Sequence, residues 1–360
     1  MNTNLMQASQ QWATRPNDER FLSLEDLKTK VAQRRSESWT ATTFTQDLRV
    51  QPTEGGLVVN VYDPSQGDVI PLNPTHWSFG QLAQYAQAPA SYLRSLPPEL
   101  AAINLQYGLE FNPVRDSGLM LAQSNGDHKL RAITSPSYGR IWDMQVVEAV
   151  EQVNQDGRWQ IPASTDQNPR RATTLYASDR DVFLFLVDPN NPVEVGSEIL
   201  FRGFYTWNSE VGSAVFGLTT FLYRTVCSNR IIWGATDVKE LRIRHTGGAP
   251  ERFAYEGRKY LQRYANESTQ KIVEGIVKAK ETDIPVRRGD TVQQWLQERG
   301  FTKAQAKAGY EAAIMEEGQA RSIWDIVNGV SAYARTLAHT DSRVELEKKA
   351  SDLMKYAGVN

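Results

Sequence analysis

Three segments rich in aromatic and branched aliphatic residues constrain the fold of this chain more than any other feature. Residues 182–187 are apolar at every position, which is typical of a strand buried on both faces. In residues 199–207, large side chains such as Tyr205 recur on one face of the expected strand, and Arg202 lies on the other. Residues 214–227 have a similar composition and are expected to form a strand, although a buried helix also fits their length.

Turn and capping signals place further elements around these strands. Gly-Gly at 55–56 and Asn-Gly at 125–126 lie between apolar runs, which predicts hairpins over residues 44–62 and 118–134. Helices are predicted where apolar residues recur at helical spacing behind a capping residue. They cover residues 23–35, 75–88, parts of 91–111, 143–154, 251–280, 291–300, 301–318, 322–338 and 343–354.

The order of these elements predicts an α+β fold, in which an antiparallel sheet is packed by helices and a helical module follows at the C-terminal end. A chain of 360 residues is long for one domain, so a division into units is expected. The polar residues 1–20 are expected to form a flexible arm. We place the α+β core at residues 21–285 and the helical module at residues 286–360.

Composition narrows the class of protein. Lys and Arg number 40 against 42 Asp and Glu, which excludes a polycation but permits one local basic face. Cys227 is the only cysteine, so no disulfide forms within the chain, as suits a reducing cytosol. The beginning of the sequence lacks the pattern of a signal peptide, and no run of 18 apolar residues exists. We therefore expect a cytoplasmic protein with no membrane partner.

One segment departs from the near-neutral charge of the chain. Residues 224–263 hold nine bases and four acids, a net charge of +5, with aromatic residues between them. Cations that neutralise phosphates and rings on which bases stack are what single-strand binding needs. The predicted nucleic-acid contacts in and next to this segment are the bases Arg224, Arg230, Lys239, Arg242 and Arg244 and the rings Tyr205, Trp207, Tyr223 and Trp233. The structural alternative is a solvated strand edge whose charges prevent aggregation.

Two turns are also candidates. The turn in residues 135–143 leads into a helix, whose free backbone amides could bind a phosphate, with Arg140 inside the turn and Arg131 just before it. An ordinary turn explains the same residues. The small polar residues of 208–213 suggest a functional loop, and a hairpin turn requires the same residue types.

Signatures of several chemistries are missing from the sequence. Four scattered histidines and one cysteine do not make a zinc motif, and no spaced pair of carboxylates indicates another metal. Neither phosphate-binding glycine motif of nucleotide and dinucleotide sites occurs. We therefore expect no metal, no cofactor and no assigned catalytic residue. An enzyme acting on nucleic acid would need carboxylates brought together from distant segments.

Long blocks of the sequence resemble the prokaryotic phage/plasmid-like protein family, a domain of unknown function. They are QLAQYAQAPASYLRSLPPELAAINLQYGL (81–109), LRAITSPSYGRIWDMQVVEAV (130–150), FRGFYTWNSEVGSAVFGLTTFLYRTVCSNRIIWGA (201–235) and ELRIRHTGGAPERF (240–253). The resemblance implies a bacterial, phage or mobile-element setting and carries no catalytic residues. The order of a helix, antiparallel strands and a long helix from Asp143 onward also resembles the core of single-strand annealing proteins.

Two hypotheses follow for the function. In the first, the protein is a non-enzymatic, oligomeric protein of a phage or plasmid that binds or anneals single-stranded DNA in recombination. In the second, it is an interaction or anti-defence factor that binds a host protein and no nucleic acid. Binding to single-stranded oligonucleotide that weakens steeply with salt would favour the first. A pull-down that survives nuclease treatment would favour the second.

Overall fold

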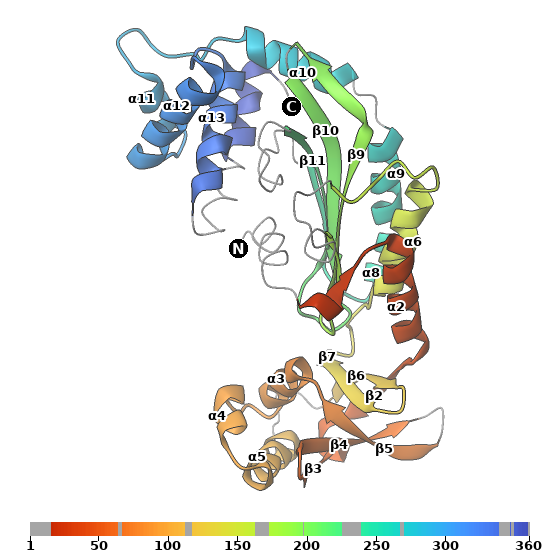
Figure 1. The fold of residues 1–360 in the computed structure, drawn as a ribbon. Coiled ribbons are helices and arrows are strands. Elements are labelled where there is room, and N and C mark those ends of the chain that lie inside the picture. Colours follow the sequence, from red (N-terminus) through yellow and green to blue (C-terminus); the bar gives the residue numbers. More distant parts are fainter. Residues whose placement is uncertain are drawn as a thin grey trace.

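Two sheets of six strands each organise the described part of the chain. The computed structural model describes residues 16–63, 67–111, 117–162, 173–196, 198–224, 239–266, 270–337, 346 and 349–358. Figure 1 shows the sheets one above the other, with the helices α11, α12 and α13 at the far end of the upper one. The predicted α+β class with C-terminal helices is confirmed, with two sheets in place of the single one expected.

One sheet has the strand order β1-β8-β9-β10-β11-β12 and is antiparallel throughout. We call it the larger sheet, because it contains the longest strands, β9 and β10. Its strands are β1 (Arg20–Phe21), β8 (Leu175–Ala177), β9 (Val182–Val195), β10 (Glu198–Asn208), β11 (Phe216–Arg224) and β12 (Lys239–Ile243). The helices α2 (Leu24–Ser36), α6 (Asp143–Val153), α8 (Ala249–Arg252) and α9 (Arg258–Asn266) lie along one side of it (Figure 1). A π-helical turn at Phe253–Gly257 joins α8 to α9. The segment at 214–227 is thus a strand as far as Arg224, and the rest of it lies outside the described residues.

Residues 182–187 of β9 are buried on both faces of this sheet, as their composition predicted. On the helical side, Leu184 and Phe204 belong to a core that they share with α2, α6 and α9. On the other side, Tyr205 and the ring of Trp207 are also buried. A Cβ on Gly217 would lie 1.9 Å from that ring, so the neighbouring strand needs glycine there.

The smaller sheet has the strand order β2-β6-β7-β5-β4-β3 and is antiparallel except between β5 and β7. Its strands are β2 (Ser38–Phe44), β3 (Arg49–Thr53), β4 (Gly56–Asp63), β5 (Asp68–Pro74), β6 (Ser117–Ser124) and β7 (His128–Thr134). The helices α3 (His76–Tyr85), α4 (Ala90–Ser95) and α5 (Pro98–Phe111) pack against it. Both predicted hairpins occur here, as β3–β4 and β6–β7.

Strands β2 and β5 were not predicted. Strand β5 contains two prolines, Pro71 and Pro74, a residue that is rare inside strands. Residues 68–72 of that strand pair only with β4, and Asn73 and Pro74 pair only with β7, so each residue has one unpaired side, where proline is tolerated.

The C-terminal helices pack on the end of the larger sheet. They are α10 (Gln270–Glu281), α11 (Val292–Gln297), α12 (Lys303–Glu317) and α13 (Ile323–Thr336), followed by a 3-10 turn at Leu353–Ala357. Trp295 and Trp324 share one apolar core with Leu200 and Leu222 of the sheet. Gly318 ends α12 in the left-handed conformation, as its place after the apolar pattern predicted. The helix predicted over 251–280 is found as α8 to α10, with residues 267–269 outside the described part.

Among the described residues, no helix is both long enough and apolar enough to cross a membrane.

Candidate functional site

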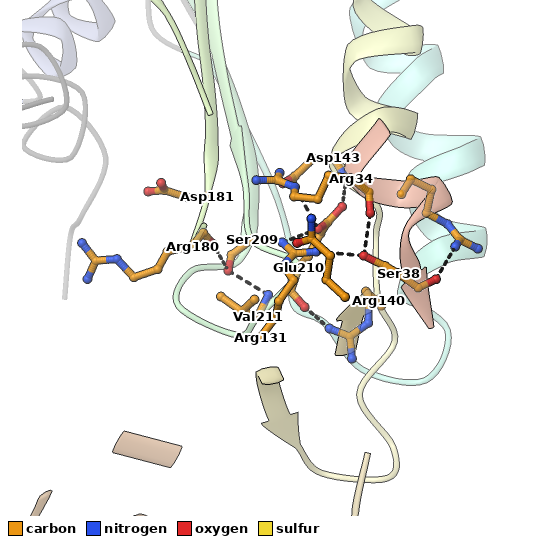
Figure 2. Close-up of polar contacts among 12 residues, drawn as sticks. Arg34, Ser38, Arg131, Arg140, Asp143, Arg180, Asp181, Ser209, Glu210 and Val211 are labelled. Atoms are coloured by element: carbon orange, nitrogen blue, oxygen red, sulfur yellow. Dashed lines mark hydrogen bonds and ion pairs between the residues drawn. The ribbon is translucent and has the colours of Figure 1, made fainter. Parts of the chain in front are cut away.

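A cluster of buried charges lies where the two sheets meet. We call it the charged joint and define it as Arg34, Arg131, Arg140, Asp143 and Glu210 (Figure 2). Arg131 belongs to β7 of the smaller sheet. The other four come from α2, from the segment that leads into α6, and from the loop between β10 and β11. The two turn motifs singled out in the sequence, 135–143 and 208–213, therefore meet at one place.

Glu210 is the centre of the charged joint. Its carboxylate forms an ion pair with Arg131, with 2.7 Å between Arg131 Nη2 and Glu210 Oε2. It also accepts a hydrogen bond of 3.0 Å from the backbone N–H of Asp143, the first residue of α6. Arg34 Nε lies 3.6 Å from the same carboxylate. Glu210 thus connects the smaller sheet to two helices of the larger one.

Asp143 has partners of its own within the larger-sheet region. Arg34 forms an ion pair with Asp143 and donates a second hydrogen bond to the carbonyl of Ser178. Asn208, at the end of β10, donates to Asp143 Oδ1 over 2.7 Å. The end of α2, the start of α6 and two strand ends are therefore tied together by buried polar groups.

The two carboxyl groups of the joint titrate differently. Burial, followed by the negative charge of Glu210, raises the pKa of Asp143 to about 8. Burial also acts to raise the pKa of Glu210, but Arg34 and Arg131 outweigh it and lower that pKa below its usual value. Three guanidinium groups face two carboxyl groups here, so the joint is positively charged in its interior.

Arg140 supplies the third guanidinium. It is 7 % exposed and donates a hydrogen bond to the backbone carbonyl of Glu210. Its Nε and Nη2 atoms are buried without a hydrogen-bond partner, and its charge lies 5.2 Å from the centre of the Tyr138 ring. Burial lowers the pKa of Arg140 to about 10.

Serine side chains shape two of the chain turns beside the joint. Ser209 Oγ accepts from the backbone N–H groups of Val211 and Ser213, and donates to the carbonyl of Arg180 over 2.7 Å. Ser178 Oγ accepts from the N–H groups of Arg180 and Asp181 in the turn between β8 and β9. The small polar residues of 208–213 are thus used to build a turn.

A close backbone contact joins the turn at 135–142 to the segment after β12. The N–H of Gly139 donates to the carbonyl of His245 over 3.2 Å, and the ring of His245 stacks on Tyr138 at 4.9 Å. A Cβ on Gly139 would lie 1.8 Å from the carbonyl oxygen of Thr246, so only glycine fits. Burial lowers the pKa of His245 to about 4, and its ring is therefore neutral at physiological pH.

Val211 completes the joint with an apolar contact. It is fully buried between Leu121 and Ala132 of the smaller sheet. Its carbonyl accepts hydrogen bonds from Trp77 Nε1 at 2.9 Å and Gln81 Nε2 at 2.8 Å, both on α3. The loop after β10 is therefore inserted into the smaller sheet and its helix.

This geometry corrects the phosphate interpretation of residues 135–143. The backbone N–H of Asp143, at the start of α6, already donates to the Glu210 carboxylate, and the N–H of Trp142 donates to Gln145 Oε1. An internal carboxylate thus occupies the place of the expected anion. Arg131 and Arg140 are buried and bound to Glu210, so they cannot contact phosphate at the surface of this fold.

The predicted stacking rings need a similar correction. Tyr205 and Trp207, on the face of the larger sheet opposite its helices, are buried. They pack on each other, with ring centres 5.6 Å apart, and are inaccessible to bases. The backbones of Tyr223, Arg224 and Lys239 lie in β11 and β12, while their side chains are outside the described part, as are Arg230 and Trp233 altogether.

Among the predicted bases whose side chains the structure describes, two are not fully buried. Arg244 is exposed, and Arg242 is partly buried on β12. The helices that follow add bases that were counted in the sequence but not chosen as contacts. We call Arg244, Arg252, Lys259 and Arg263, with the ring of Tyr255, the basic stripe, and all five side chains are exposed.

Tyr255 is the ring of the basic stripe that is open to a ligand. Its side chain is 68 % exposed, and Lys259 Nζ lies 5.1 Å from the ring centre. Arg252 pairs with Glu256 one turn along the helix. Helical spacing alone could have singled out residues 252, 255 and 259, because they recur at three and four positions.

The described residues contain no group of three or more His, Cys, Asp or Glu side chains that could hold a metal ion.

The fold and the charged joint define the class of the protein. It is an α+β protein with two sheets that are connected by buried ion pairs and hydrogen bonds. A family model described as Domain of unknown function (DUF932) matches residues 133–353, and the chain belongs to this family. The match begins at the end of β7, so the block at 81–109 and most of the smaller sheet precede it. No curated protein and no solved structure matches the chain.

Proposed function

We propose that this protein binds single-stranded DNA through the basic stripe. It acts without catalysis in recombination or annealing, as an oligomer, in the cytoplasm of a cell that carries a phage or plasmid. The observation that carries the proposal is the exposed Tyr255 ring beside Lys259 on α9, with Arg244 and Arg263 also exposed. Exposed cations that follow a backbone and an open ring for stacking are the two requirements of single-strand binding.

The buried bases have a different role in this proposal. Arg131 and Arg140 hold the joint together, and His245, which contacts Gly139 beside the joint, directly follows Arg244. The joint thus fixes the segment that carries the first base of the stripe. DNA contact is expected at the surface of α8 and α9, away from the covered faces of the larger sheet.

The test is fluorescence anisotropy with a labelled oligo-dT of about 30 nucleotides, a length that covers several binding sites. We expect affinity to fall steeply with salt. The triple variant Arg244→Glu/Lys259→Glu/Arg263→Glu should bind at least about tenfold more weakly and show a flatter salt dependence. Its matched control is Arg287→Glu/Arg288→Glu/Lys303→Glu, three exposed bases in the C-terminal region, which should stay within about threefold of wild type.

Equal affinity for the two triple variants would refute the basic stripe as the binding surface. Light scattering with and without the oligonucleotide reports the mass of the assembly, and a closed oligomer that takes up DNA supports annealing. A monomer that ignores DNA, together with a pull-down that survives nuclease, would replace the proposal by host-protein binding.

A further inference from the structure

Helix α5 carries apolar residues on two opposite sides. One side, with Leu105 and Leu109, is buried against the smaller sheet. The other side is open. It is formed by Leu100 (49 % exposed), Ile103 (65 %), Tyr107 (67 %) and Phe111 (64 %), which we call the α5 stripe. Figure 1 shows α5 at the end of the molecule opposite α11, α12 and α13.

The spacing of the α5 stripe makes it one continuous surface. Its residues follow each other at three and four positions, so they lie on one side of the helix. The rings of Tyr107 and Phe111 are in contact, with centres 5.0 Å apart. A helix that is apolar all round is normally buried on all sides, so the open side of α5 has the composition of a covered surface.

The size of the surface limits its occupant. Rings of this kind bury about 150–250 Å² each, so the four partly exposed side chains offer on the order of 500 Å². A standard protein interface buries about 800 Å² on each partner. The α5 stripe is therefore too small to hold a stable dimer by itself, and it fits a single docked helix.

Charge around the stripe indicates the kind of helix. The two charged residues of α5, Glu99 and Glu110, are exposed and lie on one flank of the stripe. The arginines of neighbouring elements bond backbone carbonyls: Arg94 that of His76 and Arg49 that of Gln46. A second copy docked antiparallel would bring Glu99 of one α5 next to Glu110 of the other, which is unfavourable.

We infer that the α5 stripe is a docking site for an amphipathic helix of another protein, with apolar residues at helical spacing and Lys or Arg along one flank. The stripe lies before the residues that match the family model, and it shares no residue with the basic stripe. The inference is therefore independent of DNA binding.

The probe is a labelled synthetic helix of about four turns, with Leu at helical spacing and Lys on the flanks. A second peptide has Glu in place of Lys. We expect the Lys peptide to bind wild type at least about tenfold more tightly than the Glu peptide. The variant Ile103→Ser/Tyr107→Ser should weaken binding of the Lys peptide by at least about tenfold.

A second variant tests the charge. Glu99→Gln/Glu110→Gln should weaken binding of the Lys peptide about threefold and reduce its advantage over the Glu peptide. The control is Tyr62→Ser, an exposed ring on β4 of the same sheet, which should leave affinity unchanged. The inference is overturned if Ile103→Ser/Tyr107→Ser binds the Lys peptide as tightly as wild type does. It is also overturned if wild type self-associates in sedimentation and the Ile103→Ser/Tyr107→Ser variant does not, because a second copy would then cover the stripe.

Discussion

The two sheets of this protein are buried to very different extents. Residues 182–188 of β9, an inner strand of the larger sheet, are all buried, whereas only Val50 of β3, at the edge of the smaller sheet, is. The larger sheet has a core on its helical face and buried rings such as Tyr205 on the other, while the smaller one is covered by α3, α4 and α5 and leaves rings such as Tyr62 exposed. A strand buried on both faces gives a continuous apolar run, and a half-buried strand gives an alternating one.

The same contrast separates the parts of the chain by role. The family match covers the strands of the larger sheet from β8 onward and the C-terminal helices. Most of the smaller sheet precedes the match and carries the α5 stripe. The two regions share the charged joint, to which the smaller sheet contributes Arg131 and the larger one Glu210. Substitutions in the charged joint therefore test how the two regions depend on each other.

Glu210→Ala should have the largest effect. It leaves Arg131 buried without its carboxylate and Arg34 with Asp143 alone, and breaking a buried pair in this way costs about 3–5 kcal/mol. Urea unfolding followed by fluorescence measures the loss of stability. The control is Glu298→Ala, whose half-exposed carboxylate pairs with Arg287 and Arg299 and should contribute less than about 1 kcal/mol. Similar losses for the two variants would mean that the joint does not hold the two regions together.

Gly139→Ala should come next. The new Cβ would meet the carbonyl oxygen of Thr246, and the backbone must shift at a cost of about 1–3 kcal/mol. Gly248→Ala, in the adjacent loop, is the matched control, since no atom lies within 4 Å of its Cβ position. That variant should stay within about 0.5 kcal/mol of wild type in the same unfolding experiment. A stable Gly139→Ala protein would show that the turn and the loop after β12 can separate freely.

Asp143→Asn should have an effect that depends on pH. The pKa of Asp143 is about 8 in the folded protein and lies above its unfolded value of 3.8, so the folded state holds the proton more tightly. This carboxyl group stabilises the fold below the unfolded pKa, and the contribution is lost as pH rises toward 8. In Asp143→Asn that loss is absent, so stability relative to wild type should improve by about 2 kcal/mol between pH 6 and pH 8.

Unfolding of both proteins at pH 5, 6, 7 and 8 measures this slope. Glu210 does not interfere in that range, because its pKa is lowered and its contribution is lost only as pH falls below about 4.5. Parallel stability curves for wild type and variant would mean that Asp143 is ionised throughout, as a simple partner of Arg34.

Much of the fold could be predicted from residue patterns because the strongest signals are local. Asn-Gly at 125–126 between two apolar runs specifies the β6–β7 hairpin, and Thr302 with Gln305 caps α12. Strand β5 could not be predicted, since its prolines are acceptable only where pairing is one-sided. The second sheet could not be predicted either, because its parallel contact joins residues 73 and 129, which are far apart in the sequence.

The candidate site shows where sequence reasoning ends. The basic composition of residues 224–263 and the two polar turns were visible in the sequence. The sequence did not show which arginines face water, because Arg131 and Arg244 look alike in it. Arg131 is buried and paired with Glu210, which lies 79 positions later, while Arg244 is exposed. The sequence by itself determined the local elements, the apolar runs and the local charge. The tertiary structure decided which charges are shared inside and which remain for a partner, since burial depends on contacts between distant residues.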